Sequence, residues 1–268
     1  MAWRWSGSRG AHRRLRLRAG PGAGINGPFG IYKTVVMAVR YVQTPTPSFL
    51  FDLDGTLIDS VYQHVIAWRA ALSAIGIDLS VWRIHRRIGM SGGLFVSALL
   101  RETGRSLSKA DIDLLQQAHA EQYRAQLDTV TPLPGARDLL GFLTDAGVPW
   151  AIATSGYAAT ARPALGLLGL PADTPMVTRD LVRHAKPDPD LFLAAAAVLE
   201  IEPQHAFVVG DSVWDLLAAR RAGALGVGLM SGGYGREELE RAGAYRVYAD
   251  PAEILARIDE LGVRTGQA

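Results

Sequence analysis

The sequence predicts an α/β fold in which helices cover both faces of a parallel sheet, with a small helical segment inserted into it. Two observations carry this prediction. From Pro134 to the end of the chain, short apolar runs alternate with helical segments, the pattern of strand–helix–strand units. Between residues 60 and 128 the apolar spacing is helical, and no convincing strand interrupts it.

Composition limits the classes of protein and of site that are possible. The chain has 268 residues, of which 49% are hydrophobic and 20% charged, as in ordinary globular proteins. The absence of cysteine excludes disulfides, thiolate catalysis and cysteine-based zinc sites. No apolar run reaches the roughly 18 residues of a membrane span. We therefore expect a cytoplasmic protein with no membrane partner, and the sequence leaves monomer or dimer open.

The first segment, residues 1–47, differs from the rest. Residues 1–40 hold eight basic and no acidic side chains, which leaves 20 basic and 26 acidic ones for the remainder. The segment is rich in Arg, Gly and Pro without a regular period, so we expect a disordered extension. A targeting or nucleic-acid-binding arm is one alternative. A non-functional extension, with Met37 as the true start, is favoured, and the acidic remainder indicates no nucleic-acid partner.

The elements follow in order after this extension. The apolar run 48–53 reads as a buried strand that ends in carboxylates. Breakers divide residues 60–128 into four predicted helices, and the first shows its apolar positions at three- and four-residue spacing: Val61, Val65, Trp68, Leu72 and Ile75. Beyond them we predict helices at 135–146, 157–168, 188–199, 213–222 and 251–261. Strands are predicted at 150–153, 176–177, 206–209, 225–229 and 245–248.

Ligands of such sheets bind beyond the carboxyl ends of the strands. Asp52 and Asp54 stand at the end of the first strand, followed by Gly55, which allows a sharp turn and close approach to a phosphate. One carboxylate there can attack phosphorus, and a second can protonate the leaving oxygen and later activate water. On its own, Asp-x-Asp-Gly is also a common turn.

A second acidic pair strengthens the catalytic interpretation. Asp211 ends the predicted strand 206–209 and Asp215 follows four residues later. Mg²⁺ prefers one or two carboxylates together with phosphate and water. Asp211 could supply one beside Asp52, and Asp215 could hold a ligating water or a nearby donor. The alternative is that Asp211 only caps the following helix.

Three further polar residues are candidates for binding phosphate oxygens. Thr154 and Ser155 follow the strand 150–153, where a hydroxyl and backbone N–H groups can grip an anion, although an N-cap role is the simpler alternative. Lys186 lies in a loop before a helix whose first turn holds Pro and Asp. Its ammonium could neutralise both phosphate and Asp52, although loop lysines are usually solvated.

Together these residues resemble the motifs of the haloacid dehalogenase-like (HAD) hydrolase superfamily over residues 48–250. The motifs are Asp52-Leu53-Asp54-Gly55-Thr56, Thr154, Lys186 and Gly210-Asp211-Ser212 with Asp215. The resemblance implies a Rossmann-like α/β core at 48–59 and 134–268, with a helical cap at 60–133 as in the phosphoglycolate phosphatase and β-phosphoglucomutase-like subgroup. It also implies Mg²⁺ and an aspartyl-phosphate on Asp52. Asp54 would be the acid/base, with its carbonyl on the metal. Asp52 and Asp211 would also be metal ligands, and Thr154 and Lys186 would bind the phosphoryl group.

Within this family we favour a phosphatase. Dehalogenases look different at the position of Asp54. The β-phosphoglucomutase-like branch is the stronger rival, but its cap loop usually carries an arginine where this chain has Gly92. A non-catalytic binding protein on the same scaffold is the third alternative. A helical cap leaves room for small substrates, so we expect a phosphosugar, phosphoglycolate or similar metabolite. The cap candidates for specificity are His64, Arg86, Arg87, Met90 and Ser91.

Overall fold

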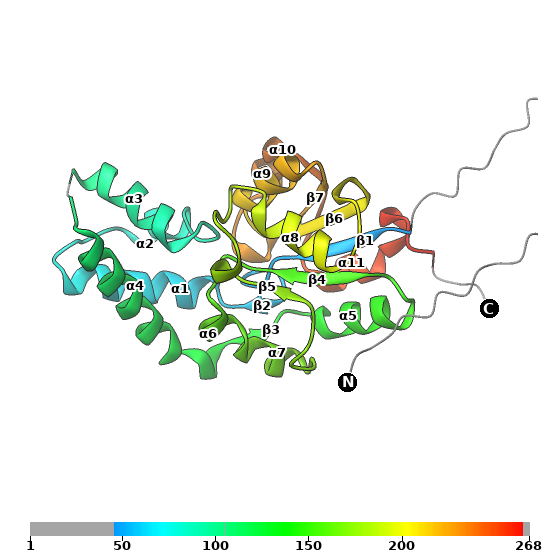
Figure 1. The fold of residues 1–268 in the computed structure, drawn as a ribbon, viewed down its shortest axis with the longest axis horizontal. Coiled ribbons are helices and arrows are strands. Elements are labelled where there is room, and N and C mark those ends of the chain that lie inside the picture. The colour runs from blue at the N-terminus through cyan, green and yellow to red at the C-terminus, as the bar shows by residue number, and fades with distance from the viewer. Residues whose placement is uncertain (1–45, 105, 265–268) are drawn as a thin grey trace, which may run out of the picture. The chain divides into compact units, whose positions relative to one another are not determined.

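The centre of the fold is a parallel sheet in the order β5-β4-β1-β6-β7-β8 (Figure 1). The computed structural model describes residues 46–104 and 106–264, and this sheet has six strands among them. The strands are β1 (Ser48–Phe51), β4 (Trp150–Ala153), β5 (Met176–Val177), β6 (Ala206–Gly210), β7 (Leu225–Leu229) and β8 (Ala244–Tyr248). The predicted α/β class is confirmed, and each predicted strand is found where the sequence placed it. The expected disorder of residues 1–47 and the role of Met37 fall almost entirely outside the described residues.

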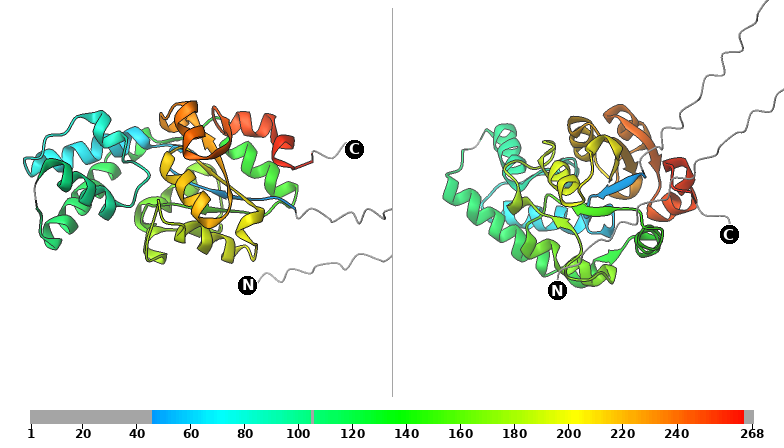
Figure 2. Two further views of the ribbon diagram at one scale, coloured as in Figure 1. Left: turned by 90° about the horizontal axis from the view of Figure 1, so that it is seen from above. Right: turned by 45° about the vertical axis from the view of Figure 1, so that its right-hand side comes forward.

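Alternate side chains of the central strand face opposite layers of helices. Phe49 and Phe51 pack with α5 (Ala136–Asp145), α7 (Pro163–Leu168) and α11 (Pro251–Ala256). Leu50 packs on the other face against α8 (Asp190–Val198) and α9 (Val213–Ala222), and Figure 2 shows helices on both sides of the sheet. Burial on both faces explains why the strands read as continuous apolar runs.

Four helices are inserted between the first strand and the rest of the sheet. They are α1 (Val61–Ala74), α2 (Val81–His85), α3 (Gly92–Thr103) and α4 (Lys109–Arg124), and Figure 1 shows them grouped beside the sheet. Their buried side chains, among them Trp68, Leu72 and Phe95, form an apolar cluster of their own. The inserted helices and the sheet belong to one compact unit of the chain.

Several predicted elements need correction. The helix expected at 157–168 is divided into α6 (Ala158–Ala161) and α7, because Pro163 lacks the N–H that a continuous helix needs. The helix expected at 251–261 ends at Ala256 and continues as a 3-10 turn.

A pair of short strands that was not predicted flanks residues 60–128. Strand β3 (Thr131–Pro132) pairs antiparallel with β2 (Ile58–Asp59) and ties together the two chain segments that lead into and out of the four helices. Two-residue strands are too short to show a period in the sequence.

The helix α10 (Arg236–Ala242) was not predicted. Leu239 is its only buried residue, so it shows no apolar stripe. Among the described residues, no helix is long and apolar enough to cross a membrane.

Candidate active site

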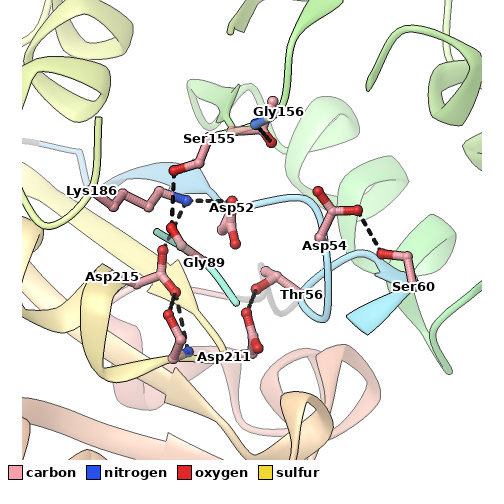
Figure 3. Close-up of polar contacts among 12 residues, drawn as sticks. Asp52, Asp54, Thr56, Ser60, Gly89, Ser155, Gly156, Lys186, Asp211 and Asp215 are labelled. Atoms are coloured by element: carbon pink, nitrogen blue, oxygen red, sulfur yellow. Dashed lines mark hydrogen bonds and ion pairs between the residues drawn. The ribbon is translucent and has the colours of Figure 1, made fainter. Parts of the chain in front are cut away.

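Three buried carboxylates meet at the carboxyl edge of the sheet. Asp52 follows β1, Asp211 follows β6, and Asp215 lies in the first turn of α9. One oxygen of each lies within 4.8 Å of the other two. Because β1 and β6 pair in parallel, with Phe51 opposite Val209, their ends coincide and bring Asp52 and Asp211 together (Figure 3).

A buried cation lies among these acids. Lys186, from the loop between β5 and α8, has no exposed surface, and its Nζ bonds Asp52 and lies 2.8 Å from Oδ1 of Asp215 (Figure 3). Burial alone would lower the pKa of Lys186, but the two carboxylates outweigh it and raise that pKa. The side chain is therefore an ammonium held inside the protein.

The acids outnumber this cation. Burial, followed by repulsion from the neighbouring carboxylates, raises the pKa of Asp211 well above its usual range. Burial is also the largest cause that raises the pKa of Asp52 to about 7. Three carboxylates against one ammonium leave an excess of negative charge that a divalent cation would balance, and hard oxygen donors suit such an ion. The residues present therefore fit a divalent metal.

The three carboxylates differ in how fully they are engaged. Asp215 uses Oδ1 for Lys186 and Oδ2 for the N–H (3.1 Å) and hydroxyl (2.6 Å) of Ser212, closing a capping box on α9. Asp211 receives a long hydrogen bond of 3.4 Å from Thr56 Oγ1 at its Oδ1. This contrast favours Asp211 as a direct ligand and Asp215 as a supporting group.

Asp54 belongs to a separate polar group. Its carboxylate turns toward Ser60, whose hydroxyl donates to Oδ1 at 2.6 Å (Figure 3). The same Oδ1 lies 3.1 Å from Nε2 of His64. Burial would raise the pKa of Asp54, but His64 and Ser60 together lower it below the usual value. The Asp54 side chain is about 20% exposed, so it can be reached from outside the buried cluster.

The inserted helices contribute a second histidine, which no motif in the sequence marks. His119 on α4 places Nε2 at 3.1 Å from Nδ1 of His64 on α1. The ring of Trp68 stacks on His119 with centroids 4.1 Å apart, and Tyr123 stacks on His64 at 3.9 Å. His64 and His119 lie 55 positions apart, so only the packing of α1 on α4 brings them together.

The hydroxyls of Thr154 and Ser155, which follow β4, each make a hydrogen bond to the main chain. The buried Oγ1 of Thr154 accepts the N–H of Gly156 at 2.9 Å, which fixes the turn after the strand. Ser155 donates from Oγ to the carbonyl of Gly89 at 3.0 Å (Figure 3). Ser155 thus joins the core to the loop that precedes α3.

A cavity of about 110 Å³ opens over Asp52 and Asp54. Its other walls include Thr154 and Ser155 from the core and Trp68, Phe95 and His119 from the inserted helices. Of the candidate specificity residues, His64, Arg87 and Met90 line it.

The remaining two specificity candidates lie elsewhere. Arg86 pairs with Glu238 of α10 and stacks over Tyr234 at 4.3 Å. Ser91 is the N-cap of α3, accepting the N–H of Leu94. Neither Arg86 nor Ser91 is among the described residues that line the cavity.

Comparisons with known proteins agree with this arrangement of residues. Residues 47–223 match the model of the haloacid dehalogenase-like hydrolases. The chain belongs to this family. Hexitol phosphatase A of Escherichia coli is 36% identical over 179 residues, 65% of this chain and 79% of that protein. A phosphoglycolate phosphatase of Rhodospirillum rubrum is 33% identical, over 76% of this chain and 88% of that protein. The crystal structure of a hydrolase from Pseudomonas syringae is 52% identical with a TM-score of 0.79, covering 80% of this chain and 98% of that one.

Proposed function

We propose that this protein is a Mg²⁺-dependent phosphatase that hydrolyses a small phosphorylated metabolite, such as a phosphosugar or a phosphoglycolate-like ester. The observation that carries the proposal is the buried cluster of Asp52, Lys186 and Asp211 beneath a small cavity, with Asp54 beside it. The related phosphatases support the substrate class. A cytoplasmic location and a metabolite, rather than a nucleic acid or a membrane, as the partner belong to the same proposal.

Asp52 and Asp54 would carry out different steps of the reaction. An oxygen of Asp52 attacks phosphorus, the ester P–O bond breaks, and Asp54 gives a proton to the leaving oxygen. Asp54 then takes a proton from water, which attacks the phosphorus, releases phosphate and restores Asp52. Asp54 is ionised without substrate, because its pKa is lowered. A bound phosphate dianion would raise that pKa, and Asp54 would take up from solvent the proton that it then gives to the leaving oxygen.

The other site residues complete the assignment. Asp52, Asp211 and the main-chain carbonyl of Asp54 would hold Mg²⁺, which when bound offsets negative charge on the phosphate oxygens. Lys186 and Thr154 would bind the phosphoryl group beside Asp52.

Residues 60–133 would act as the cap. Their loop contacts Ser155, and their side chains close one side of the cavity. His64, Arg87 and Met90 are the members of this segment best placed to contact the leaving group.

A phosphosugar mutase must hold a second phosphate group, and the cavity offers little for it. Arg87 is the only lysine or arginine among the described residues that line the cavity. Its guanidinium donates to Glu102 and, at 2.7 Å, to the carbonyl of Arg83. With the glycine at position 92, this arrangement favours transfer of the phosphoryl group to water.

The direct test is a screen of phosphorylated metabolites with Mg²⁺ or with a chelator, on the wild-type chain and on Asp52→Asn. We expect Asp52→Asn to lower turnover by about 10³-fold or more, since loss of a nucleophile removes the covalent route. Asp59→Asn, an exposed aspartate in β2, is the matched control. Retained Mg²⁺-dependent turnover in Asp52→Asn would overturn the mechanism, and isomerisation of glucose 1-phosphate would favour the mutase.

A further inference from the structure

Three side chains from three different elements form a continuous line beside the cavity. Oδ1 of Asp54, after β1, lies 3.1 Å from Nε2 of His64 on α1. Nδ1 of the same ring lies 3.1 Å from Nε2 of His119 on α4. Both nitrogens of His64 are therefore used, one toward the sheet and one toward the inserted helices.

His64 is the central member of this line. Both ring nitrogens of His64 are engaged, so one contact joins the ring to Asp54 and a second joins it to His119. Removal from water, followed by the nearby His64, lowers the pKa of His119 well below its usual value, so the His119 ring is neutral.

The rings around the line restrict its geometry. His119 stacks on Trp68, which also packs against Phe95 at a centroid distance of 4.2 Å. His64 stacks nearly parallel to Tyr123, with 5° between the ring planes. These contacts hold both rings from their faces, whereas the hydrogen bond between the two histidines sets rotation within the ring plane.

We propose that His119 is a positioning residue for hydrolysis: its hydrogen bond fixes the ring orientation of His64, and His64 in turn orients the carboxylate of Asp54 toward the leaving group. This inference rests on the proposed function, because it assigns a role within that reaction. It also means that the inserted helices do more than cover the cavity, since they supply both rings that orient the acid/base. Residues that orient a reacting group without touching the substrate commonly change activity by about 10- to 100-fold.

The test compares substitutions that keep or remove the hydrogen bond. His119→Phe keeps an aromatic ring against Trp68 but cannot bond His64, whereas His119→Gln keeps a polar group of similar reach. We expect His119→Phe to lower kcat about 10-fold with little change in KM or Mg²⁺ affinity, and His119→Gln to recover most of the loss. Gln117→Leu, an exposed change on the same helix, is the control.

A double substitution separates this role from a structural one. If His119 acts through His64, the pair His64→Phe and His119→Phe should be no slower than His64→Phe alone. Unchanged kcat in His119→Phe, or fully additive losses in the double variant, would overturn the proposal. Should His119→Phe fail to fold, His119→Leu against His119→Gln gives the same comparison. A wild-type chain that hydrolyses no phosphate ester would instead refute the proposed function.

Discussion

A methyl group added at Gly232 tests whether Asp211 binds the metal. Gly232 ends a short 3-10 turn after β7, and a Cβ built there would lie 1.7 Å from Oδ2 of Asp211. Real Cβ atoms essentially never approach a neighbour more closely than 3.0 Å, so either the carboxylate or the turn must move by more than an ångström. The backbone at Gly232 does not have a positive φ, so alanine itself fits and the clash alone decides the outcome.

The size of the displacement sets the expected effect. Mg²⁺–oxygen bonds of about 2.0–2.1 Å tolerate errors of only about 0.2 Å. Gly232→Ala should therefore weaken Mg²⁺ binding by about 10- to 100-fold, equal to about 1.4–2.7 kcal/mol, and lower turnover at limiting Mg²⁺. The assay is a Mg²⁺ titration of hydrolysis, with calorimetric titration of the metal alone.

The matched control is Gly141→Ala within α5, where an added Cβ meets nothing within 4 Å. That variant should keep its Mg²⁺ affinity and gain about 0.5–1 kcal/mol of unfolding free energy. Wild-type Mg²⁺ affinity in a folded Gly232→Ala variant would refute the assignment of Asp211 as a ligand.

The remaining predictions concern two basic residues, Lys186 and Arg86, and the acidic side chains that they pair with. Lys186→Met leaves buried carboxylates without their cation, so the unfolding free energy should fall by about 3–5 kcal/mol in metal-free protein and recover partly with Mg²⁺, as thermal melts can show. Arg86→Ala should lower the unfolding free energy by less than about 1 kcal/mol, because both side chains of the pair with Glu238 are more than one-third exposed. The same substitution should lower kcat/KM if this contact holds the inserted helices closed. The hydrogen bond from Arg86 lowers the pKa of Glu238. The small stability from this pair should therefore be present above the ordinary glutamate pKa and be lost as pH falls through the lowered value, which unfolding at pH 7 and pH 3 would measure.

The part of the fold that the sequence predicts well is the part set by apolar periodicity. The strands 150–153 and 225–229 match the predicted bounds, because each is an apolar run between breakers. Helix α10 was not predicted, because its burial depends on one leucine. Glu238, the partner of Arg86, lies on this helix and was therefore not identified either. Elements that contact the fold through one or two residues leave too little pattern to detect.

The same distinction applies to the site. Asp52 and Asp211 gather because parallel strand ends coincide, a consequence of topology that the sequence carries. Lysines in loops are usually solvated, yet the structure buries Lys186 completely between two carboxylates. His119 and Gly232 could not be predicted, since one depends on helix packing and the other on the space left beside a carboxylate.

The two halves of the site are held by different parts of the chain, which has a measurable consequence. The charge cluster of Asp52, Lys186 and Asp211 belongs entirely to the sheet and its loops, whereas Asp54 is oriented by rings from the inserted helices. Substitutions at His64 or His119 should therefore change kcat without changing Mg²⁺ affinity. Substitution of Gly232 should do the reverse and leave turnover near normal at saturating Mg²⁺. If both classes of variant changed the same parameter, the carboxylates and the acid/base would have to act as one coupled unit, and the separation read from the geometry would be wrong.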